Sequence, residues 1–279
     1  MSMGSREFDF VRDLVRSESA IVLDTGKEYL VESRLLPLAR AAGHSDVTSY
    51  VADVALRRQP RLLTAVVEAL TTNETSWFRD NDPFTALRTT VLPTLAKTRP
   101  RKAIRIWCAA CSSGQEPYSV AMSVLDSPLL ANWDVTIVAT DLSDEMVQRG
   151  RAGEYSQLEV NRGLPASLLV RHFERDGLNW RISPELRSKV EFRQLNLLRP
   201  YSLMGKFDIV FMRNVLIYFD LETKRDILRR VRQVTAPDGY LFLGGAEMTR
   251  GVDDGWEREP TGRSALYRIR EEDRSCVPW

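Results

Sequence analysis

The chain has 279 residues, in which 39 Lys and Arg residues offset 38 Asp and Glu residues to leave a formal net charge of +1. This balance gives no sign of a nucleic-acid or membrane-surface partner, and no apolar run approaches the ~20 residues of a transmembrane helix. With 43% hydrophobic residues, the chain can bury the core of one large domain or two smaller ones.

The cysteine count and the first residues indicate a cellular compartment. Three cysteines do not form a disulfide scaffold. The N-terminal stretch carries five charged residues and lacks the apolar core of a signal peptide. We therefore expect a cytoplasmic protein. The charged residues are Arg6, Glu7, Asp9, Arg12 and Asp13.

Residues 1–72 predict a small helical domain, because apolar residues recur in them at helical spacing. Gly43 is placed to end one helix, and Asp46 or Thr48 to begin the next. The domain also holds five arginines, either on solvated helix faces or on a basic face that meets an acidic partner. They are Arg34, Arg40, Arg57, Arg58 and Arg61.

A polar segment with two aromatic residues, 71–82, follows this domain. Helical periodicity resumes from Pro83 to Ala96, and Pro93 is expected to end or kink that helix. The pattern then changes to alternating strands and helices, which predicts an α/β domain with a mostly parallel sheet over residues 73–270. Expected strands are Ile104–Trp107, Val135–Ala139, Val190–Leu195, Phe207–Met212, Tyr240–Leu243 and Ala265–Ile269, and expected helices include Asp144–Arg151 and Leu221–Val234.

Three further features interrupt or end this alternation. Residues 164–190 predict an inserted β-subdomain, in which Phe173–Ile182 forms a hairpin around Asp176 and Gly177. Asp238 and Gly239 predict a turn before the strand at Tyr240. Residues 271–279 are polar and predict a flexible tail.

The stretch from Ile104 to Met122 joins an apolar strand, a loop of small residues and a helix. Such a loop lets a ligand approach the free backbone N–H groups at the start of the helix. It lacks the G-x-G-x-x-G pattern, and Glu116 at the helix start would repel a phosphate. A dinucleotide is therefore disfavoured, and a nucleoside that carries a positive group fits better.

Polar residues follow several of the predicted strands, where parallel sheets bind their ligands. We interpret Asp141, Asn196, Arg213 and Asn214 as one site, although strands often end in polar turns. Asp141 is placed to accept hydrogen bonds from ribose hydroxyls, roughly 30 residues after the loop rather than the usual ~20. With Glu116 beside an ammonium group, S-adenosylmethionine has the required shape.

At this point the sequence resembles the CheR-type chemotaxis receptor methyltransferases, which are protein-glutamate O-methyltransferases. The resemblance covers nearly the whole chain, and the motifs are highly specific in combination. The matching stretches are TTNETSWFRD at 71–80, CSSGQEPYSVAM at 111–122, ATDLSDEMV at 139–147, NLL at 196–198, RNVLIYF at 213–219 and FLGGAE at 242–247.

The resemblance implies a small all-helical N-terminal domain before a class I S-adenosylmethionine-dependent methyltransferase domain with a Rossmann-like sheet. It implies methylation of glutamate side chains on the cytoplasmic helical region of chemoreceptors, with S-adenosylhomocysteine as product and no metal. A receptor C-terminal peptide binds the β-subdomain in some relatives. Implied cofactor contacts are Asn73, Thr75, Arg79, Glu116, Asp141, Asn196, Leu197, Arg213 and Asn214, and Arg79 and Tyr218 are implied near the methyl-transfer centre.

The sequence departs from the family pattern in detail. Gln115 replaces a usual Glu, Cys108 a usual Ser, Trp77 a usual Phe, and Gly245–Ala246 a usual His–Ser. Glu116 and Arg79 are intact.

Three alternatives remain. Trp107–Cys111 reads W-C-x-x-C at a strand-to-helix junction, where a lowered thiol pKa would suit a redox protein. A non-catalytic S-adenosylmethionine-binding signalling protein would need Asp141 and Glu116 but not Arg79 and Tyr218. A methyltransferase of a different substrate would retain the cofactor site.

Overall fold

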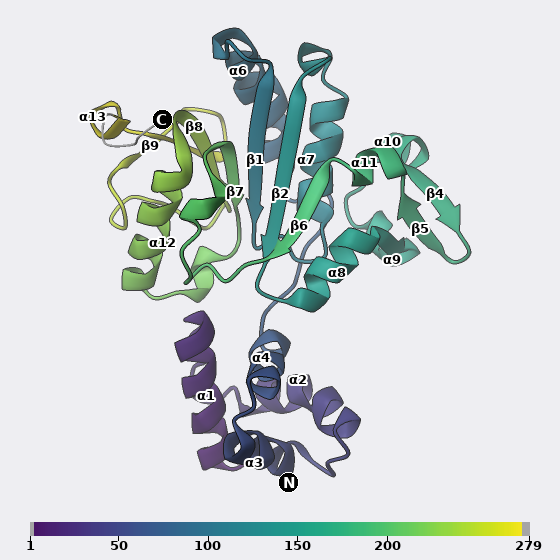
Figure 1. The fold of residues 1–279 in the computed structure, drawn as a ribbon, viewed down its shortest axis with the longest axis vertical. Coiled ribbons are helices and arrows are strands. Elements are labelled where there is room, and N and C mark those ends of the chain that lie inside the picture. Colours follow the sequence, from purple (N-terminus) through teal and green to yellow (C-terminus); the bar gives the residue numbers. More distant parts are fainter. Residues whose placement is uncertain (1–2, 275–279) are drawn as a thin grey trace. The chain divides into compact units, whose positions relative to one another are not determined.

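The computed structural model describes residues 3–274, and its chain divides into two compact units, drawn in Figure 1. The helical unit comprises residues up to Thr72 together with Asn196–Leu198 and Tyr218–Thr223. The sheet unit comprises the rest of the chain. None of the helices in the described part combines the length and the apolar character that a membrane span requires.

Four helices build the helical unit. Helix α1 packs on α3 and α4, and α2 packs on the same two helices. Valine and leucine side chains fill the space between them, including Val11, Val31, Leu35 and Val51. Asp46 caps α3 by accepting a hydrogen bond from the Ser49 backbone N–H at 2.8 Å, so the predicted start at Asp46 is confirmed. The helices are α1 (Ser5–Ser19), α2 (Glu28–Ala41), α3 (Val47–Arg57) and α4 (Pro60–Ala69).

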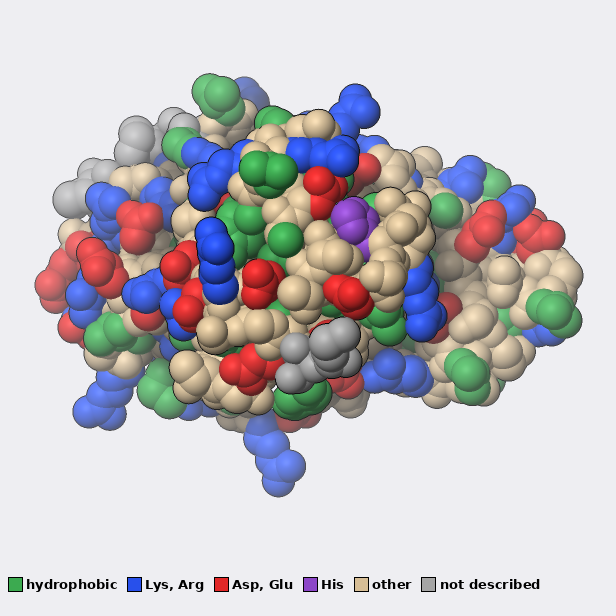
Figure 2. Space-filling model, turned by 90° about the horizontal axis from the view of Figure 1, so that it is seen from below, with side chains coloured by type: hydrophobic (Ala, Val, Ile, Leu, Met, Phe, Trp, Pro, Cys, Tyr) green, Lys and Arg blue, Asp and Glu red, His purple; other side chains and the backbone are tan. Residues whose placement is uncertain are grey.

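The arginines of this unit are not gathered into one basic face. Arg34 donates hydrogen bonds to the carbonyl oxygens of Leu70 and Thr71, at 2.8 and 2.5 Å. Arg57 forms an ion pair with Asp53 at 2.7 Å. Figure 2 shows basic and acidic side chains interspersed. Arg34 and Arg57 are therefore engaged by groups of this unit.

The sheet unit contains a large mixed sheet with the strand order β6-β2-β1-β7-β8-β10-β9. The strands from β6 to β8 are parallel, so their carboxyl ends lie along one edge, and β10 and β9 are antiparallel. The predicted mostly parallel sheet is therefore confirmed. The strands are β1 (Ala103–Ala109), β2 (Asp134–Asp141), β6 (Val190–Gln194), β7 (Phe207–Met212), β8 (Thr235–Leu243), β9 (Trp256–Arg258) and β10 (Ala265–Ile269).

The central strands β1 and β7 are almost entirely buried, as expected of parallel strands that are covered on both faces. The rings of Phe211 and Phe242 stack across β7 and β8, with centroids 4.4 Å apart. The helical elements of this unit are α5 (Asp82–Ala86), η1 (Leu87–Val91), α6 (Leu92–Thr98), α7 (Gln115–Leu125), η2 (Pro128–Leu130), α8 (Asp144–Ala152), α9 (Gln157–Asn161), α10 (Ala166–His172), α11 (Pro184–Arg187), η3 (Ser202–Met204), η4 (Leu216–Tyr218), α12 (Leu221–Val234) and α13 (Glu271–Arg274), of which η4 and α12 extend into the helical unit.

Three local expectations need correction. Pro93 does not end the helix that begins at Asp82, because α6 continues beyond it, although a π-helical segment, η1, interrupts the regular helix just before the proline. Asp238 and Gly239 lie inside β8 rather than in a turn, and the pairing of β7 with β8 absorbs them by a shift in register. Part of the tail is ordered, because Glu271–Arg274 forms α13; residues 275–279 lie outside the described residues.

A small antiparallel sheet with the order β3-β5-β4 stands apart from the large one, as Figure 1 shows. Strands β4 (Phe173–Asp176) and β5 (Asn179–Ile182) pair around Gly177, which confirms the predicted hairpin. Strand β3 (Glu154–Ser156) adds a third strand from before the segment in which a subdomain was expected. The two edge strands of the small sheet are therefore β3 and β4.

Candidate active site

The loop between β1 and α7 is held in an unusual backbone conformation. Ala110, Ser112 and Gly114 all have positive φ angles, of 55°, 50° and 98°. A Cβ atom on Gly114 would lie 3.0 Å from the Tyr155 hydroxyl and 3.2 Å from Cα of Gly150. Only glycine fits at position 114, where the φ angle is positive and an added Cβ atom has no space.

Asp141 ends β2, directly beside the loop that follows β1. Its Oδ2 accepts a hydrogen bond from the backbone N–H of Ser112 at 2.7 Å, and its Oδ1 accepts one from the N–H of Ser143 at 3.0 Å. Burial raises the pKa of Asp141, and these backbone N–H groups oppose that rise by stabilising the ionised form. The Leu142 backbone N–H is a third donor to this carboxylate, which leaves about one of its four acceptor positions for a further donor such as a ribose hydroxyl.

Glu116 lies in the first turn of α7 and faces the end of β7. Its Oε2 accepts a hydrogen bond from Nη1 of Arg213 at 2.9 Å. Among the side-chain hydrogen bonds of residues 3–274, only this oxygen of Glu116 is engaged, which leaves Oε1 for another donor. Burial raises the pKa of Glu116, and the Arg213 charge opposes the rise. The Nε atom of Arg213 is buried and has no protein partner.

The segment that carries Arg79 is strained. Phe78, Asp80 and Asn81 all have positive φ angles, at 47°, 65° and 50°, although none of them is glycine. Arg213 helps to hold this segment, because its Nη2 donates to the Arg79 carbonyl at 2.9 Å and to the Asp80 carboxylate at 2.6 Å. Strain of this kind persists only where the surroundings impose it, so the position of Arg79 is set in advance of any substrate.

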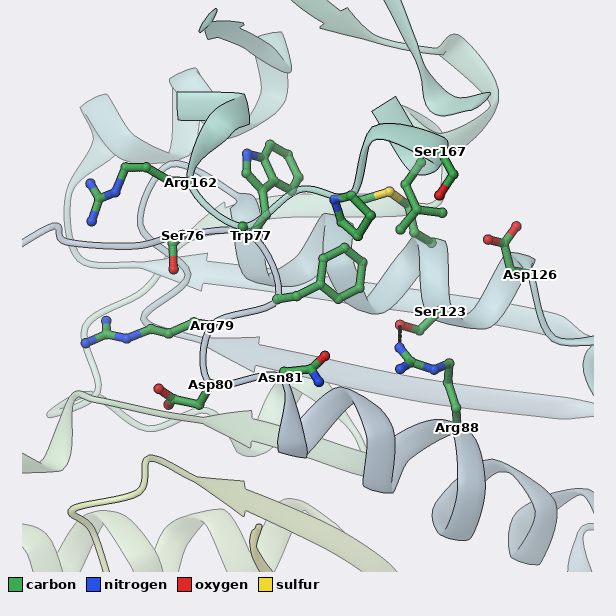
Figure 3. A pocket seen from close by; sticks show the side chains of 15 residues that line it. Ser76, Trp77, Arg79, Asp80, Asn81, Arg88, Ser123, Asp126, Arg162 and Ser167 are labelled. Carbon is green, nitrogen blue, oxygen red and sulfur yellow. Dashed lines mark hydrogen bonds between the residues drawn. The ribbon is translucent and has the colours of Figure 1, made fainter. Parts of the chain in front are cut away.

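The guanidinium of Arg79 donates to the Glu74 carbonyl at 3.0 Å. Arg79 also borders a cleft of about 900 Å³, shown in Figure 3, which Arg88 lines as well. Glu116 and Asp141 are not among the residues that line this cleft. The backbone carbonyl of Arg79 therefore contacts Arg213, and the segment that carries Arg79 forms part of the cleft wall.

The other predicted site residues fall into two groups. Asn73 belongs to the sheet-unit cluster, because its carbonyl accepts a hydrogen bond from the Ser112 hydroxyl at 2.8 Å. Thr75 lines a small hollow together with Asn73. Asn214 follows β7 with a φ of 58°, and its backbone N–H donates to the Glu247 carboxylate at 2.8 Å.

Three predicted residues belong to the helical unit instead: Asn196, Leu197 and Tyr218. The Asn196 side chain donates to the Glu18 carbonyl at 2.6 Å, and the Tyr218 carbonyl accepts from the Val22 N–H at 3.4 Å. The structure thus brings Asn73, Glu116, Asp141, Arg213 and the Arg79 segment together within the sheet unit. Sequence reasoning missed Asp80 and Glu247, which look like ordinary surface carboxylates in the sequence.

The two cysteines of the W-C-x-x-C motif are not a redox centre of the expected kind. Both thiols are buried, and burial raises the pKa of Cys108 and of Cys111 well above the usual value. The redox alternative required a lowered pKa, because the thiolate is the reactive form. Residues 3–274 also contain no group of three or more His, Cys, Asp or Glu residues arranged to hold a metal ion.

Comparison with known proteins assigns both parts of the chain. Residues 73–263 match the model described as "CheR methyltransferase, SAM binding domain", and residues 6–71 match "CheR methyltransferase, all-alpha domain". The chain is 44% identical over 277 residues to Chemotaxis protein methyltransferase 1 of Pseudomonas aeruginosa, covering 97% of this chain and 100% of that one. It is 41% identical over 276 residues to Chemotaxis protein methyltransferase Cher2 of Pseudomonas putida, with the same coverage.

Among solved structures, a TehB-like SAM-dependent methyltransferase from Corynebacterium glutamicum is similar with a TM-score of 0.39 and 11% identity, covering 69% of this chain and 97% of that one.

Proposed function

The chain belongs to the CheR methyltransferase family, and we propose that it transfers a methyl group from S-adenosylmethionine to glutamate side chains of chemoreceptors. The products are glutamyl methyl esters and S-adenosylhomocysteine. The observation that carries this proposal is the pair of buried carboxylates, Asp141 at the end of β2 and Glu116 in the first turn of α7. Carboxylates at these places suit ribose hydroxyls and a cation, and they disfavour the phosphates of a dinucleotide.

The described residues fit this cofactor. Oε1 of Glu116 is open to an ammonium group, and the Asp141 carboxylate retains an acceptor position beside its three backbone donors. The buried Nε of Arg213 lacks a partner and could donate to a carboxylate. Bound there, S-adenosylmethionine supplies a methyl group on a cationic sulfur. We assign the further cofactor contacts to Asn73, Thr75, Arg79, Asn196, Leu197, Arg213 and Asn214 on the basis of the family motifs.

The acceptor needs no general base. A glutamate side chain has an unperturbed pKa of about 4.3, so it is already an anion near neutral pH. The protein must instead orient that carboxylate and remove part of its water shell. Arg79 lies on a segment that Arg213 holds in a strained conformation, and its guanidinium could bind the acceptor carboxylate. Tyr218 is assigned near the same centre from the family motif, as a hydrogen-bond donor or a packing surface.

The small sheet offers a place for a second contact with the receptor. Strands β3 and β4 are the edge strands of this sheet, and an extended peptide could add to such an edge. Leu178, in the turn between β4 and β5, is 86% exposed. We propose that a receptor C-terminal peptide docks here in addition to the methylated helical region. Such a substrate would place the protein in the cytoplasm.

The test is transfer of labelled methyl groups from S-adenosylmethionine to purified receptor cytoplasmic domains, with and without the C-terminal peptide. Base-labile label on the receptor is the expected result, because methyl esters hydrolyse in base. Weaker transfer to the shortened receptor would support peptide docking. Cofactor binding without transfer to any receptor would indicate a non-catalytic binding protein, and label stable to base would indicate a different acceptor.

A further inference from the structure

One buried carboxylate outside the predicted site accepts four backbone hydrogen bonds. Glu247 lies just beyond β8, and only 6% of it is exposed. Its Oε2 accepts from the N–H groups of Gly244 at 2.7 Å and Asn214 at 2.8 Å. Its Oε1 accepts from the N–H groups of Val215 at 2.9 Å and Ile217 at 3.3 Å.

These bonds join the carboxyl ends of two neighbouring parallel strands, β7 and β8, which Figure 1 shows side by side. Asn214 has a φ of 58°, a conformation that a non-glycine residue adopts only at a cost. The Glu247 carboxylate offsets that cost by accepting the Asn214 N–H. Gly244 leaves the space for it, since a Cβ atom there would lie 2.8 Å from Oε2 of Glu247.

The charge of Glu247 has no cationic partner among the described residues, and its hydrogen bonds there all come from backbone N–H groups. Amide dipoles can hold a buried anion, but they do not cancel its charge. The charge therefore extends into the surrounding site, where it contributes to the raised pKa of Glu116. A negative potential of this kind favours a cationic ligand over a neutral one.

We propose that Glu247 is a positioning residue for methyl transfer, with two effects. It fixes the backbone of Asn214 at the end of β7, next to Arg213. Its buried charge also favours binding of the cationic S-adenosylmethionine relative to binding of the neutral S-adenosylhomocysteine. This inference rests on the proposed cofactor site.

The test compares the dissociation constants of both ligands by calorimetry in the full-length protein. Glu247→Gln keeps the size of the side chain and removes its charge. We expect it to weaken S-adenosylmethionine binding about tenfold and S-adenosylhomocysteine binding less, so that the preference between the two falls. A purely structural role would weaken both ligands by the same factor. Glu257→Gln, which removes an exposed carboxylate on β9, is the matched control and should change neither constant.

Glu247→Asp separates the two effects, because it keeps the charge but shortens its reach. We expect it to weaken both ligands equally and to retain the preference, and circular dichroism confirms that each variant is folded. An unchanged ligand preference in folded Glu247→Gln overturns the inference. If that variant does not fold, unchanged affinities in Glu247→Asp overturn it. If the wild-type protein binds neither ligand, the proposed cofactor site itself is wrong and the inference fails with it.

Discussion

Nη1 of Arg213 lies 2.9 Å from Oε2 of Glu116, and this contact joins the end of β7 to the first turn of α7. The Arg213 side chain is 1% exposed and that of Glu116 is 11% exposed. The same guanidinium reaches the Arg79 carbonyl. Arg213 therefore links the proposed cofactor carboxylate to the segment that we expect to place the acceptor, and breaking such a buried pair costs about 3–5 kcal/mol.

Replacing Arg79 by alanine is expected to lower methyl transfer at least about 100-fold, because the acceptor carboxylate loses its orienting cation. The fold should survive, since Arg213 holds the segment through the Arg79 carbonyl and the Asp80 carboxylate, and the Arg79 side chain adds only its hydrogen bond to the Glu74 carbonyl. The measurement is the initial rate of labelled-methyl transfer to a receptor cytoplasmic domain, with a thermal melt of the same sample.

Arg88→Ala provides the control for this experiment. Arg88 lines the same cleft as Arg79, but its hydrogen bonds go to Ser123 and Thr85 rather than to the carboxylate cluster. Figure 3 shows the two arginines on separate parts of the cleft wall. The rate should fall far less in Arg88→Ala. Equal losses in both variants would show that the cleft needs positive charge in general and would contradict a specific role for Arg79.

Asp141→Ala is expected to weaken S-adenosylmethionine binding about 10–100-fold, because charge-assisted hydrogen bonds to the ribose are worth about 1.5–3 kcal/mol. The substitution also removes the acceptor of the Ser112 and Ser143 backbone N–H groups, so it affects the loop as well as the ribose contact. Asp141→Asn keeps one acceptor oxygen and should lose less affinity. Calorimetry on both variants makes the comparison, and wild-type affinity in Asp141→Ala would refute the ribose assignment.

Gly114→Ala is expected to lower the free energy of unfolding by about 1–3 kcal/mol, because alanine is strained at a φ of 98° and its Cβ has no space. Gly245→Ala is the control, since φ there is not positive and nothing lies within 4 Å of an added Cβ. Chemical denaturation measures both. A stable Gly114→Ala protein would mean that the loop is less tightly packed than the structure indicates.

The sequence predicted those parts of the site that depend on periodicity and strand order. Asp141 follows an apolar strand, and parallel pairing of β2 with β1 places it beside the small-residue loop, as expected. Periodicity also placed β7 at its observed bounds. The turn predicted at Asp238 and Gly239 was wrong, because strand pairing overrode the tendency of Asp and Gly to form a turn.

Side-chain partners could not be predicted in this way. Arg213 was expected to bind the cofactor, and the sequence gives no sign that Asp80 and Glu116 would share its guanidinium. Both contacts join residues more than about 90 positions apart, so only the folded chain brings them together. The partners of Glu247 could not be predicted either, because they are backbone N–H groups, and no pattern of residue types marks such donors in a sequence.

Cys108→Ser is expected to retain transferase activity, and the native protein should resist thiol reagents. Both thiols are buried, and their raised pKa values keep them protonated near neutral pH. Counting reactive thiols before and after denaturation checks the expected resistance to thiol reagents. Because Cys276 lies outside the described residues, Cys276→Ser should serve as the background for that count.

Cofactor affinity is expected to fall on acidification, starting above the ordinary glutamate pKa of about 4.3. Only the ionised form of Glu116 attracts an ammonium group, and burial raises its pKa, so Glu116 takes up a proton at a higher pH than an exposed glutamate does. The loss of affinity therefore grows as the pH falls through the raised pKa, and it is absent well above that value. Calorimetry from about pH 8 down to about pH 5 measures this.

Glu116→Gln isolates the contribution of this carboxylate. The variant should bind S-adenosylmethionine more weakly at about pH 8 and should show a flatter dependence on pH, because a neutral amide has no proton to gain. Asp141 also has a raised pKa and remains in the variant, so the difference between the two pH profiles, rather than either profile alone, reports Glu116. Parallel profiles for wild type and Glu116→Gln would place the ammonium group away from Glu116, and Arg213 would then be the sole partner of that buried carboxylate.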